Sequence, residues 1–385
     1  MSWPIPIFPK IECPKPISLR IWLPTLAVIA GGAAGVVLML WPHGKSTQTF
    51  QFWATLVGAP LIACALTFGV RLDQWEDEQT DAEEAEKEQK RLGGMWREWT
   101  RRHLSVVDSV AFPAVTDDMA RFTNPKTDIP VNSGRCVTFD WVKGRAITFR
   151  RTRLLHLVAR RFADTLQTRR EVIVTLFLDD ISPGNAADWT QRVKRVFGLV
   201  APRTIFQVDV QPAKKSVEWI EGQVDLVDTA TRLIIAAQLW TDEEKEHKFS
   251  EGAAAFLITP DAPHAGSIFR PMTSTRDTLD AGLNQIKAVQ ASPALLRHAW
   301  FACCEQNESI AIRFALTEDP KNSAVEHLLD KSLGLPGPAS GWMALAIAME
   351  AMRGAGPQLI AWHEGASDPL HLCMISPLPK KETTV

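Results

Sequence analysis

The stretch VFGLVAPRTIFQVDVQPAKKSVEWIEGQVDLVDTATRLIIAAQLW (residues 196–240) decides the fold, together with EGAAAFLITP at residues 251–260. Three runs of β-branched, aromatic and small apolar residues within it are typical of strands. Between the first two runs, apolar residues recur at helical spacing over residues 213–228. This order predicts a sheet that is covered by helices on both faces. The expected strands are residues 204–210, 233–240 and 253–258.

The same stretch resembles the middle of thiolase-like proteins, the superfamily of thiolases and ketoacyl synthases. Gly198 and Pro202 are similar to the loop before their nucleophile strand, and Val208-Asp209 is similar to the end of that strand. Glu251 begins a Glu-Gly-Ala-Ala stretch like the one that opens the family's second half. The resemblance implies an α/β fold with a layered α/β/α/β/α domain.

The C-terminal third extends this resemblance. The glycine-containing loop 337–341 precedes an alanine-rich run to residue 352, which predicts a buried helix, and strands are expected at residues 358–362 and 370–375. In the family, a similar loop opens a buried helix that two closing strands follow. The resemblance covers about residues 171–377, beginning with the apolar strand EVIVTLFL at residues 171–178.

That first strand ends in Asp179-Asp180. Paired carboxylates at the C-terminal end of a strand lie where open α/β sheets bind ligands. Aspartate is also a common turn residue, so both interpretations stay open. A turn and a helix at residues 186–197 follow.

The sequence also predicts the remaining elements outside these stretches. The expected strands are residues 146–150, 267–271 and 311–316. The expected helices are residues 95–110, 154–167, 278–291, 294–300 and 323–331, and residues 111–140 are expected to be irregular.

Two uncharged apolar segments near the N-terminus predict a transmembrane hairpin. Residues 21–41 and 52–70 are each near the length of one bilayer crossing, and a polar bend joins them. A cleaved signal peptide does not fit the first segment, because it is too long, lacks a small-residue cleavage site and has a second apolar segment directly behind it. A buried hairpin of a soluble protein is the alternative.

Basic residues predict the orientation of this hairpin. Lys10, Lys15 and Arg20 precede it and Arg71 follows it, whereas the bend carries only Lys45. The positive-inside rule then places both termini in the cytoplasm. We therefore expect a two-pass protein of the bacterial inner (cytoplasmic) membrane.

The segment behind the hairpin is acidic, then mixed in charge, and lacks an apolar stripe, which predicts a solvated helix that ends at Gly93-Gly94. The expected organisation has five parts. These are a cytoplasmic tail (1–20), the transmembrane hairpin (21–71), a charged helical neck (72–95), lead-in helices with an irregular segment (96–170) and the thiolase-like domain (171–385).

Composition excludes several classes of protein. A net charge of −2 over 385 residues argues against a nucleic-acid partner. The cysteines show no zinc-binding spacing, and no disulfide is expected, in keeping with a reducing compartment. They are Cys13, Cys64, Cys136, Cys303, Cys304 and Cys373. Phosphate-binding, dinucleotide-binding and serine-hydrolase motifs are missing, so neither a cofactor nor a metal is expected.

The resemblance also implies a chemistry, from which this chain departs. Condensing enzymes use a thiolate at a helix N-terminus, and Gln211 and Pro212 stand near that place. Where ketoacyl synthases carry a histidine, this chain has Leu335 and Pro336. Without a thiolate, acyl transfer by this mechanism has no nucleophile, so we expect no catalytic residues.

Three residues remain as candidates if the chain is an enzyme. His363 and Glu364 fall near the family's late reactive loop and could form an acid–base pair, although a lone loop histidine is usually just exposed. Cys303 is the candidate nucleophile, and the alternative is that Cys303 and Cys304 are buried apolar side chains. Ser340 is expected to be a helix cap.

The primary prediction is an inner-membrane-anchored, catalytically inactive thiolase-like protein that binds a client protein as an adaptor. The resemblance associates such proteins with effectors of bacterial type VI secretion and implies a homodimer. The alternative is an acyltransferase or hydrolase that acts on acyl-CoA or acyl carriers through His363 or Cys303. A third hypothesis is a structural membrane subunit or an immunity protein.

Overall fold

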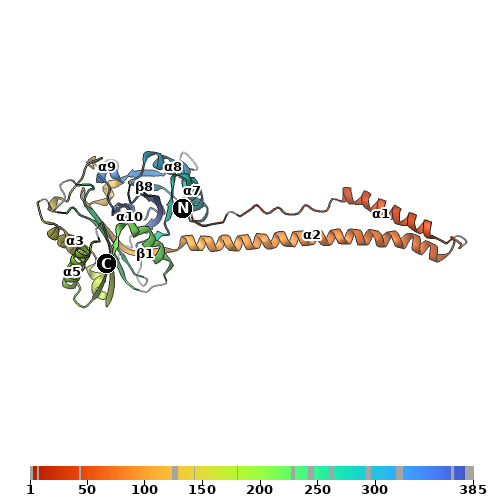
Figure 1. Ribbon diagram of the computed structural model, residues 1–385, viewed down its shortest axis with the longest axis horizontal. Coiled ribbons are helices and arrows are strands. Elements are labelled where there is room, and N and C mark those ends of the chain that lie inside the picture. Colours follow the sequence, from red (N-terminus) through yellow and green to blue (C-terminus); the bar gives the residue numbers. More distant parts are fainter. Residues whose placement is uncertain are drawn as a thin grey trace. The chain divides into compact units, whose positions relative to one another are not determined.

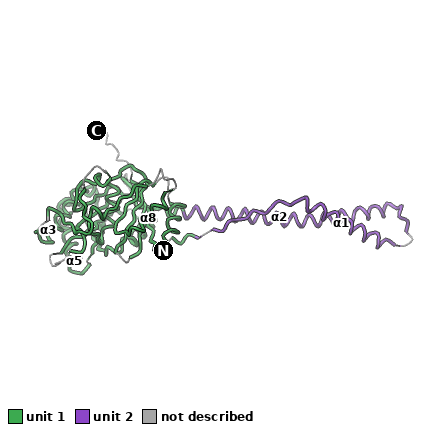
Figure 2. The backbone as a smooth tube through the Cα atoms, turned by 90° about the horizontal axis from the view of Figure 1, so that it is seen from above, with its two compact units in different colours: residues 1–5, 97–385 green, residues 6–96 purple. Residues whose placement is uncertain are grey.

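The structure is a computed structural model that describes residues 3–6, 8–42, 45–123, 129–142, 144–179, 181–226, 230–241, 247–259, 264–290, 296–317, 324–365 and 368–377. The chain divides into two compact units (Figure 2). Unit 1 contains residues 1–5 and 97–385, and unit 2 contains residues 6–96.

Helices and strands alternate through unit 1. The strands are β1 (His103–Pro113), β2 (Glu171–Leu178), β3 (Ile205–Pro212), β4 (Arg232–Gln238), β5 (Gly252–Ile258), β6 (Gly266–Phe269), β7 (Met272–Ser274), β8 (His298–Ala302), β9 (Val325–Leu328), β10 (Gln358–Trp362) and β11 (Leu370–Pro377). The α-helices are α3 (Ile147–Arg161), α4 (Ala163–Thr168), α5 (Pro183–Val200), α6 (Ser216–Asp225), α7 (Leu279–Gln285), α8 (Gln306–Leu316), α9 (Leu329–Leu333) and α10 (Ser340–Ala351).

The strands form two halves with the same topology. The first half has the order β3-β2-β4-β5-β1, and the second has the order β9-β8-β10-β11-β6, with β7 also paired to β11. In each half the first three strands are parallel, and the fourth in that order is antiparallel to its neighbours. Antiparallel pairing of β1 with β6 joins the halves. The fold is therefore a structural duplication.

Alternating side chains show how helices cover the two half-sheets, because successive residues of a strand point to opposite faces. On β4, Leu233 and Ile235 pack with α3 and α5, whereas Ile234 packs with α6 and α10. On β8, Phe301 packs with α7 and α8, whereas Trp300 joins the cluster of α6 and α10. The layers run α3/α5, half-sheet, α6/α10, half-sheet, α7/α8.

Figure 1 shows α10 and β1 between α3 and α5 at one side of unit 1 and α7 and α8 at the other. The helix α10 is apolar all round, and ten consecutive residues from Ser340 to Met349 are buried, as expected for a helix with sheets on both sides. The predicted thiolase-like α/β fold with layers α/β/α/β/α is confirmed.

Several expected elements are wrong. Residues 103–110 of the expected helix 95–110 form β1, and the expected strand 146–150 is the start of α3. The expected helix 294–300 contains the start of β8, and its residues 294–295 lie outside the described residues. The expected strand 311–316 is part of α8, and the expected helix 323–331 contains β9 before α9.

The segment before Glu171 belongs to the duplicated fold. β1 lies between β5 and β6, at the join of the two halves, and α3 packs on the outer face of the first half. Apart from residues 1–5, the compact α/β unit therefore begins at Arg97, and not at residue 171 as expected for the thiolase-like domain.

Unit 2 consists of α1 (Leu19–Leu40) and most of α2 (Phe50–Arg101), with the chain that precedes α1. Both helices are long and apolar enough to cross a membrane. They pack together through Trp22 and Phe68, whose ring centroids are 6.0 Å apart, and through Trp41 and Phe52. The helix α2 continues through Gly93-Gly94, where a break was expected.

Candidate functional site

The candidate residues Cys303 and His363 lie at neighbouring strand ends. β8 and β10 are parallel partners, so their C-terminal ends meet at one edge of the sheet. Cys303 directly follows β8 and His363 directly follows β10, and the backbone N–H of His363 donates to the carbonyl of Ala302 (3.4 Å). The structure thus brings these two candidates to the same region.

His363 is buried, and both of its ring nitrogens have partners. Nδ1 lies 2.7 Å from the carbonyl oxygen of Asp368, so it must carry a proton to donate. Nε2 lies 2.9 Å from Oε2 of Glu308, which also accepts from the backbone N–H of Glu305 at the start of α8. The imidazole therefore has no free nitrogen to act as a base on a substrate.

Cys303 has the wrong electrostatics for a nucleophile. Burial raises the pKa of its thiol to about 11, and the nearby carboxylates of Asp330, Glu308 and Asp368 add to the shift. Only about one thiol in ten thousand is then ionised at pH 7. Burial also raises the pKa of the Cys304 thiol, which donates to the carbonyl of Ala361. Both side chains are half-buried, and their raised pKa values fit the unreactive alternative.

Cys303 has an unusual backbone: with φ of 56°, it is the one non-glycine residue with positive φ in the described ranges. Its N–H donates to Oδ2 of Asp330 at 2.7 Å, and burial raises the pKa of Asp330 to about 6. This bond holds the turn after β8.

Among the residues that the structure describes, Glu364 forms no hydrogen bond or ion pair with His363, because Glu308 holds the imidazole Nε2. Burial raises the pKa of Glu364 to about 8, so its carboxyl is mainly protonated at neutral pH. Its Oε1 is shielded from solvent and has no hydrogen-bond partner among the residues that the structure describes.

Side chains of the chain itself lie at the starts of the two central helices, α6 and α10. The backbone N–H of Ala339, which precedes α10, donates to Oε1 of Gln238 (2.9 Å). The amide nitrogen of Gln238 in turn donates to the carbonyl of Ser250 (2.7 Å). At the start of α6, Ser216 accepts a hydrogen bond from the indole of Trp342 (2.9 Å). These contacts fill the space in front of the two helices, although neither helix has a side-chain cap on the N–H groups of its first turn.

The prediction that Ser340 caps α10 is wrong. Ser340 is the first residue of the helix after the N-cap Ala339, and its hydroxyl accepts from the backbone N–H of Gly337 (2.8 Å) in the preceding loop. The position of α10 leaves no room at Gly341, where an added Cβ would lie 2.4 Å from the indole nitrogen of Trp362. Between Ala302, Asp330 and the start of α10 only a cavity of about 10 Å³ remains, the space of one water.

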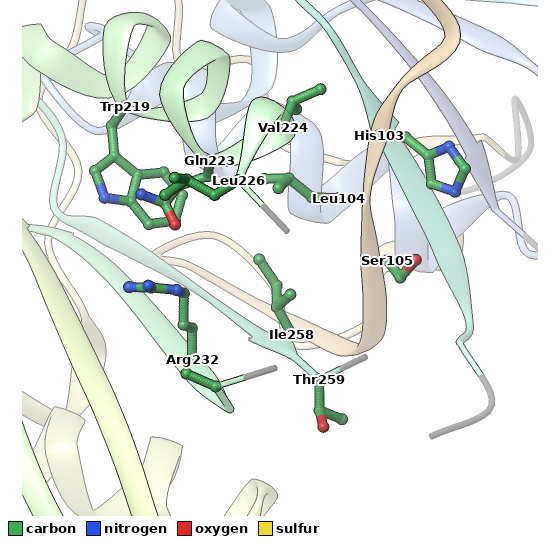
Figure 3. A pocket seen from close by; sticks show the side chains of 11 residues that line it. His103, Leu104, Ser105, Trp219, Gln223, Val224, Leu226, Arg232, Ile258 and Thr259 are labelled. Atoms are coloured by element: carbon green, nitrogen blue, oxygen red, sulfur yellow. The ribbon is translucent and has the colours of Figure 1, made fainter. Parts of the chain in front are cut away.

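A larger cavity lies at a different place in unit 1. It has a volume of about 140 Å³ and is lined by residues of β1, α6, the start of β4 and the end of β5. Figure 3 shows Trp219, Gln223 and Leu226 on the upper side of the cavity and Arg232 and Ile258 on its lower side. None of the candidates Cys303, His363 and Glu364 lines this cavity.

Sequence reasoning missed the residues that organise this region. Glu308, Asp330, Gln238 and Trp342 each hold a candidate residue or a helix start through a hydrogen bond. The pair Glu305 and Glu308 forms a capping box, and its spacing is a signal that could have found Glu308. Asp179 has a partner of its own, and Asp180 lies outside the described residues, so the paired-carboxylate interpretation stays a prediction.

No protein-family model and no curated protein matches the chain. Among solved structures, it is similar to the peroxisomal 3-ketoacyl-CoA thiolase of Saccharomyces cerevisiae, with 10% identity, 72% of this chain and 98% of that chain covered, and a TM-score of 0.48. That structure is described as five-layered and built from two core domains of identical topology.

Two further similar structures are condensing enzymes by name. One is the tetronic acid condensing enzyme AbyA1, with 12% identity, 71% of this chain and 99% of that chain covered, and a TM-score of 0.48. The other is 3-oxoacyl-[acyl-carrier-protein] synthase III from Aquifex aeolicus, with 13% identity, coverage of 71% and 99%, and a TM-score of 0.42. The duplicated topology of the chain itself defines the fold class.

Proposed function

We propose that this chain is a membrane-anchored, thiolase-like protein that carries out no acyl condensation and binds a client protein instead. The observation that carries the proposal is the filled region in front of the two central helices. Gln238 accepts from the N–H of Ala339 before α10, Trp342 donates to the Ser216 hydroxyl at the start of α6, and the adjoining cavity has a volume of about 10 Å³. An acyl thioester would need both a thiolate and a place for its carbonyl oxygen in this region.

Membrane anchoring rests on the two apolar helices. The 22 residues of α1 span about 33 Å, close to the hydrocarbon thickness of a bilayer. Their apolar side chains are exposed, such as Val28 at 75% and Leu61 at 65%, which is costly in water but favourable in lipid. The charges that flank the hairpin support cytoplasmic termini, and the bacterial inner membrane is the membrane that we propose.

We propose a protein client because unit 1 is large and ordered and would be held at a membrane. Its own side chains fill the region where acyl chemistry would take place, so its surface is the part left to act. An effector or component of type VI secretion is the class of client that the family resemblance suggests. Affinity capture from membranes with the tagged full chain, followed by identification of the captured proteins, tests this part of the proposal.

Turnover tests the absence of condensation. The full chain, purified in detergent, is incubated with acetyl-CoA and longer acyl-CoA thioesters, and free CoA is measured over time. We expect the rate to equal the rate without protein, and a ketoacyl synthase serves as the positive control. Release of CoA that disappears in Cys303→Ala or His363→Ala would instead establish the acyltransferase or hydrolase alternative.

A further inference from the structure

The N-terminus of the chain is held in a built slot of unit 1. Trp3 is 5% exposed and packs edge-on against Trp99, with 6.3 Å between ring centroids. The indole N–H of Trp3 donates to the carbonyl of Pro271 (3.0 Å), and the carbonyl of Trp3 accepts from the amide of Gln285 (3.2 Å). The slot therefore recognises both the side chain and the backbone of this residue.

The walls of the slot are fixed by other contacts. The guanidinium of Arg270 lies 3.9 Å from the ring centroid of Trp99, and its Nε donates to the carbonyl of Trp99 (3.3 Å). Trp3 belongs to the same apolar cluster as Met272, Leu279 and Leu283. An aromatic wall, a carbonyl acceptor and an amide donor are the features of grooves that bind proline-rich peptides.

The segment that follows Trp3 has the periodicity of a polyproline II helix. Its residues are neither helical nor in a strand, and Pro4, Pro6, Pro9, Pro14 and Pro16 fix their own φ angles. Every third residue is half-buried, whereas the other residues from 9 to 18 are exposed. The half-buried residues are Phe8, Ile11, Pro14 and Ile17. Three residues per turn is the repeat of polyproline II.

Within unit 2, a matching seam runs along the polar part of α2. Its half-buried residues recur at spacings of three and four from Leu72 to Ala82 and again from Gln89 to Trp96, and the indole nitrogen of Trp75 is shielded from solvent. The seam includes Leu72, Trp75, Gln79, Ala82, Gln89 and Trp96. Figures 1 and 2 both show the segment before α1 beside this part of α2.

We propose that the slot at Trp99 is a docking site for a tryptophan-bearing, proline-rich segment, and that the chain's own N-terminus occupies it as a strap. The inference is independent of the function proposed above. It replaces the expected free cytoplasmic tail by a segment that shields the slot and the seam of α2.

Peptide binding tests the docking site. A fluorescein-labelled peptide of residues 1–17 is titrated, by anisotropy, against the full chain in detergent. The Trp3→Ala chain has an empty slot and should bind the peptide saturably. The unchanged chain should bind it on the order of a hundredfold more weakly, because the tethered segment competes at high effective concentration. Glu12→Ala, an exposed strap position, is the matched control chain and should behave like the unchanged chain.

Trypsin cleavage after Lys10 gives a second measurement, since Pro16 protects the bond after Lys15 from trypsin. Loss of a buried tryptophan should release the strap and raise cleavage by about a hundredfold or more. Ile11→Ala, which leaves the slot intact, should raise it less. Equal cleavage of the unchanged and Trp3→Ala chains would overturn the strap. A peptide that binds both chains alike, binds neither, or binds equally well with its own Trp3→Ala change would overturn the docking site.

Discussion

Replacing Gln238 by alanine tests whether the start of α10 is held by an internal partner. Gln238 is fully buried, and its side chain joins the carbonyl of Ser250 to the N–H of Ala339. Gln238→Ala leaves both backbone groups without that partner, at a cost of about 1–3 kcal/mol each. A water that enters the space restores part of the loss. We expect a net destabilisation of about 3 kcal/mol.

Thermal unfolding of the full chain, followed by near-UV circular dichroism in detergent, measures this effect. A loss of about 3 kcal/mol should lower Tm by roughly 6–12 °C in a unit of this size. The matched control is Gln191→Ala on the exposed side of α5, which should change Tm by less than about 2 °C. If the Tm of Gln238→Ala equals that of Gln191→Ala, the amide of Gln238 does not stabilise the start of α10, and the prediction is wrong.

Three other changes test separate contacts. Gly341→Ala should lower stability by about 1–3 kcal/mol or more, measured by thermal unfolding, because the new Cβ meets the indole of Trp362. Burial raises the pKa of Glu350 from 4.5 to about 7, so its carboxyl stabilises the fold when protonated, and this stability is lost as pH rises through 7. Tm of Glu350→Gln relative to the unchanged protein should therefore increase from pH 5 to pH 8, and a constant difference would contradict the shift. The pKa of Cys303 is raised to about 11, so iodoacetamide should alkylate it at pH 7 on the order of a hundredfold more slowly than the exposed Cys13. Peptide mass spectrometry measures both rates. Equal rates would contradict the argument that burial suppresses the thiolate of Cys303.

The buried elements of the fold could be predicted because their sequence patterns are strong. β2, β4, β5 and α10 are continuous apolar runs, which is what strands and helices with both faces covered require. The resemblance added the order of layers, which no internal sequence repeat shows. Composition and length of the two N-terminal segments were enough to predict apolar helices.

The errors fall where local pattern and tertiary context disagree. The run IAIRFAL in α8 alternates like a strand, but the capping box at Glu305 and Glu308 starts a helix whose buried face includes Ile312. β1 follows α2 after one residue, so no turn signal separates the helix from the strand. β8 is a short apolar segment, for which helix and strand cannot be distinguished by periodicity alone.

The candidate site was predictable only in part. The strand-end positions of Cys303 and His363 follow from the topology, whereas Glu308 and Asp330 reach them from α8 and α9, which sequence spacing does not reveal. The contacts at the two helix starts depend on Gln238 and Trp342, two residues that look like ordinary core positions in the sequence. Such contacts are long-range, and a single sequence carries no direct signal for them.

Covalent labelling tests the central claim, a thiolase-like body whose acyl site is filled, most directly. The full chain is incubated with radiolabelled acetyl-CoA, quenched in acid and counted for protein-bound label. The account predicts no label above that of a heat-unfolded sample. Near-stoichiometric label on the folded chain, mapped to Cys303 or another residue of this region, would contradict it.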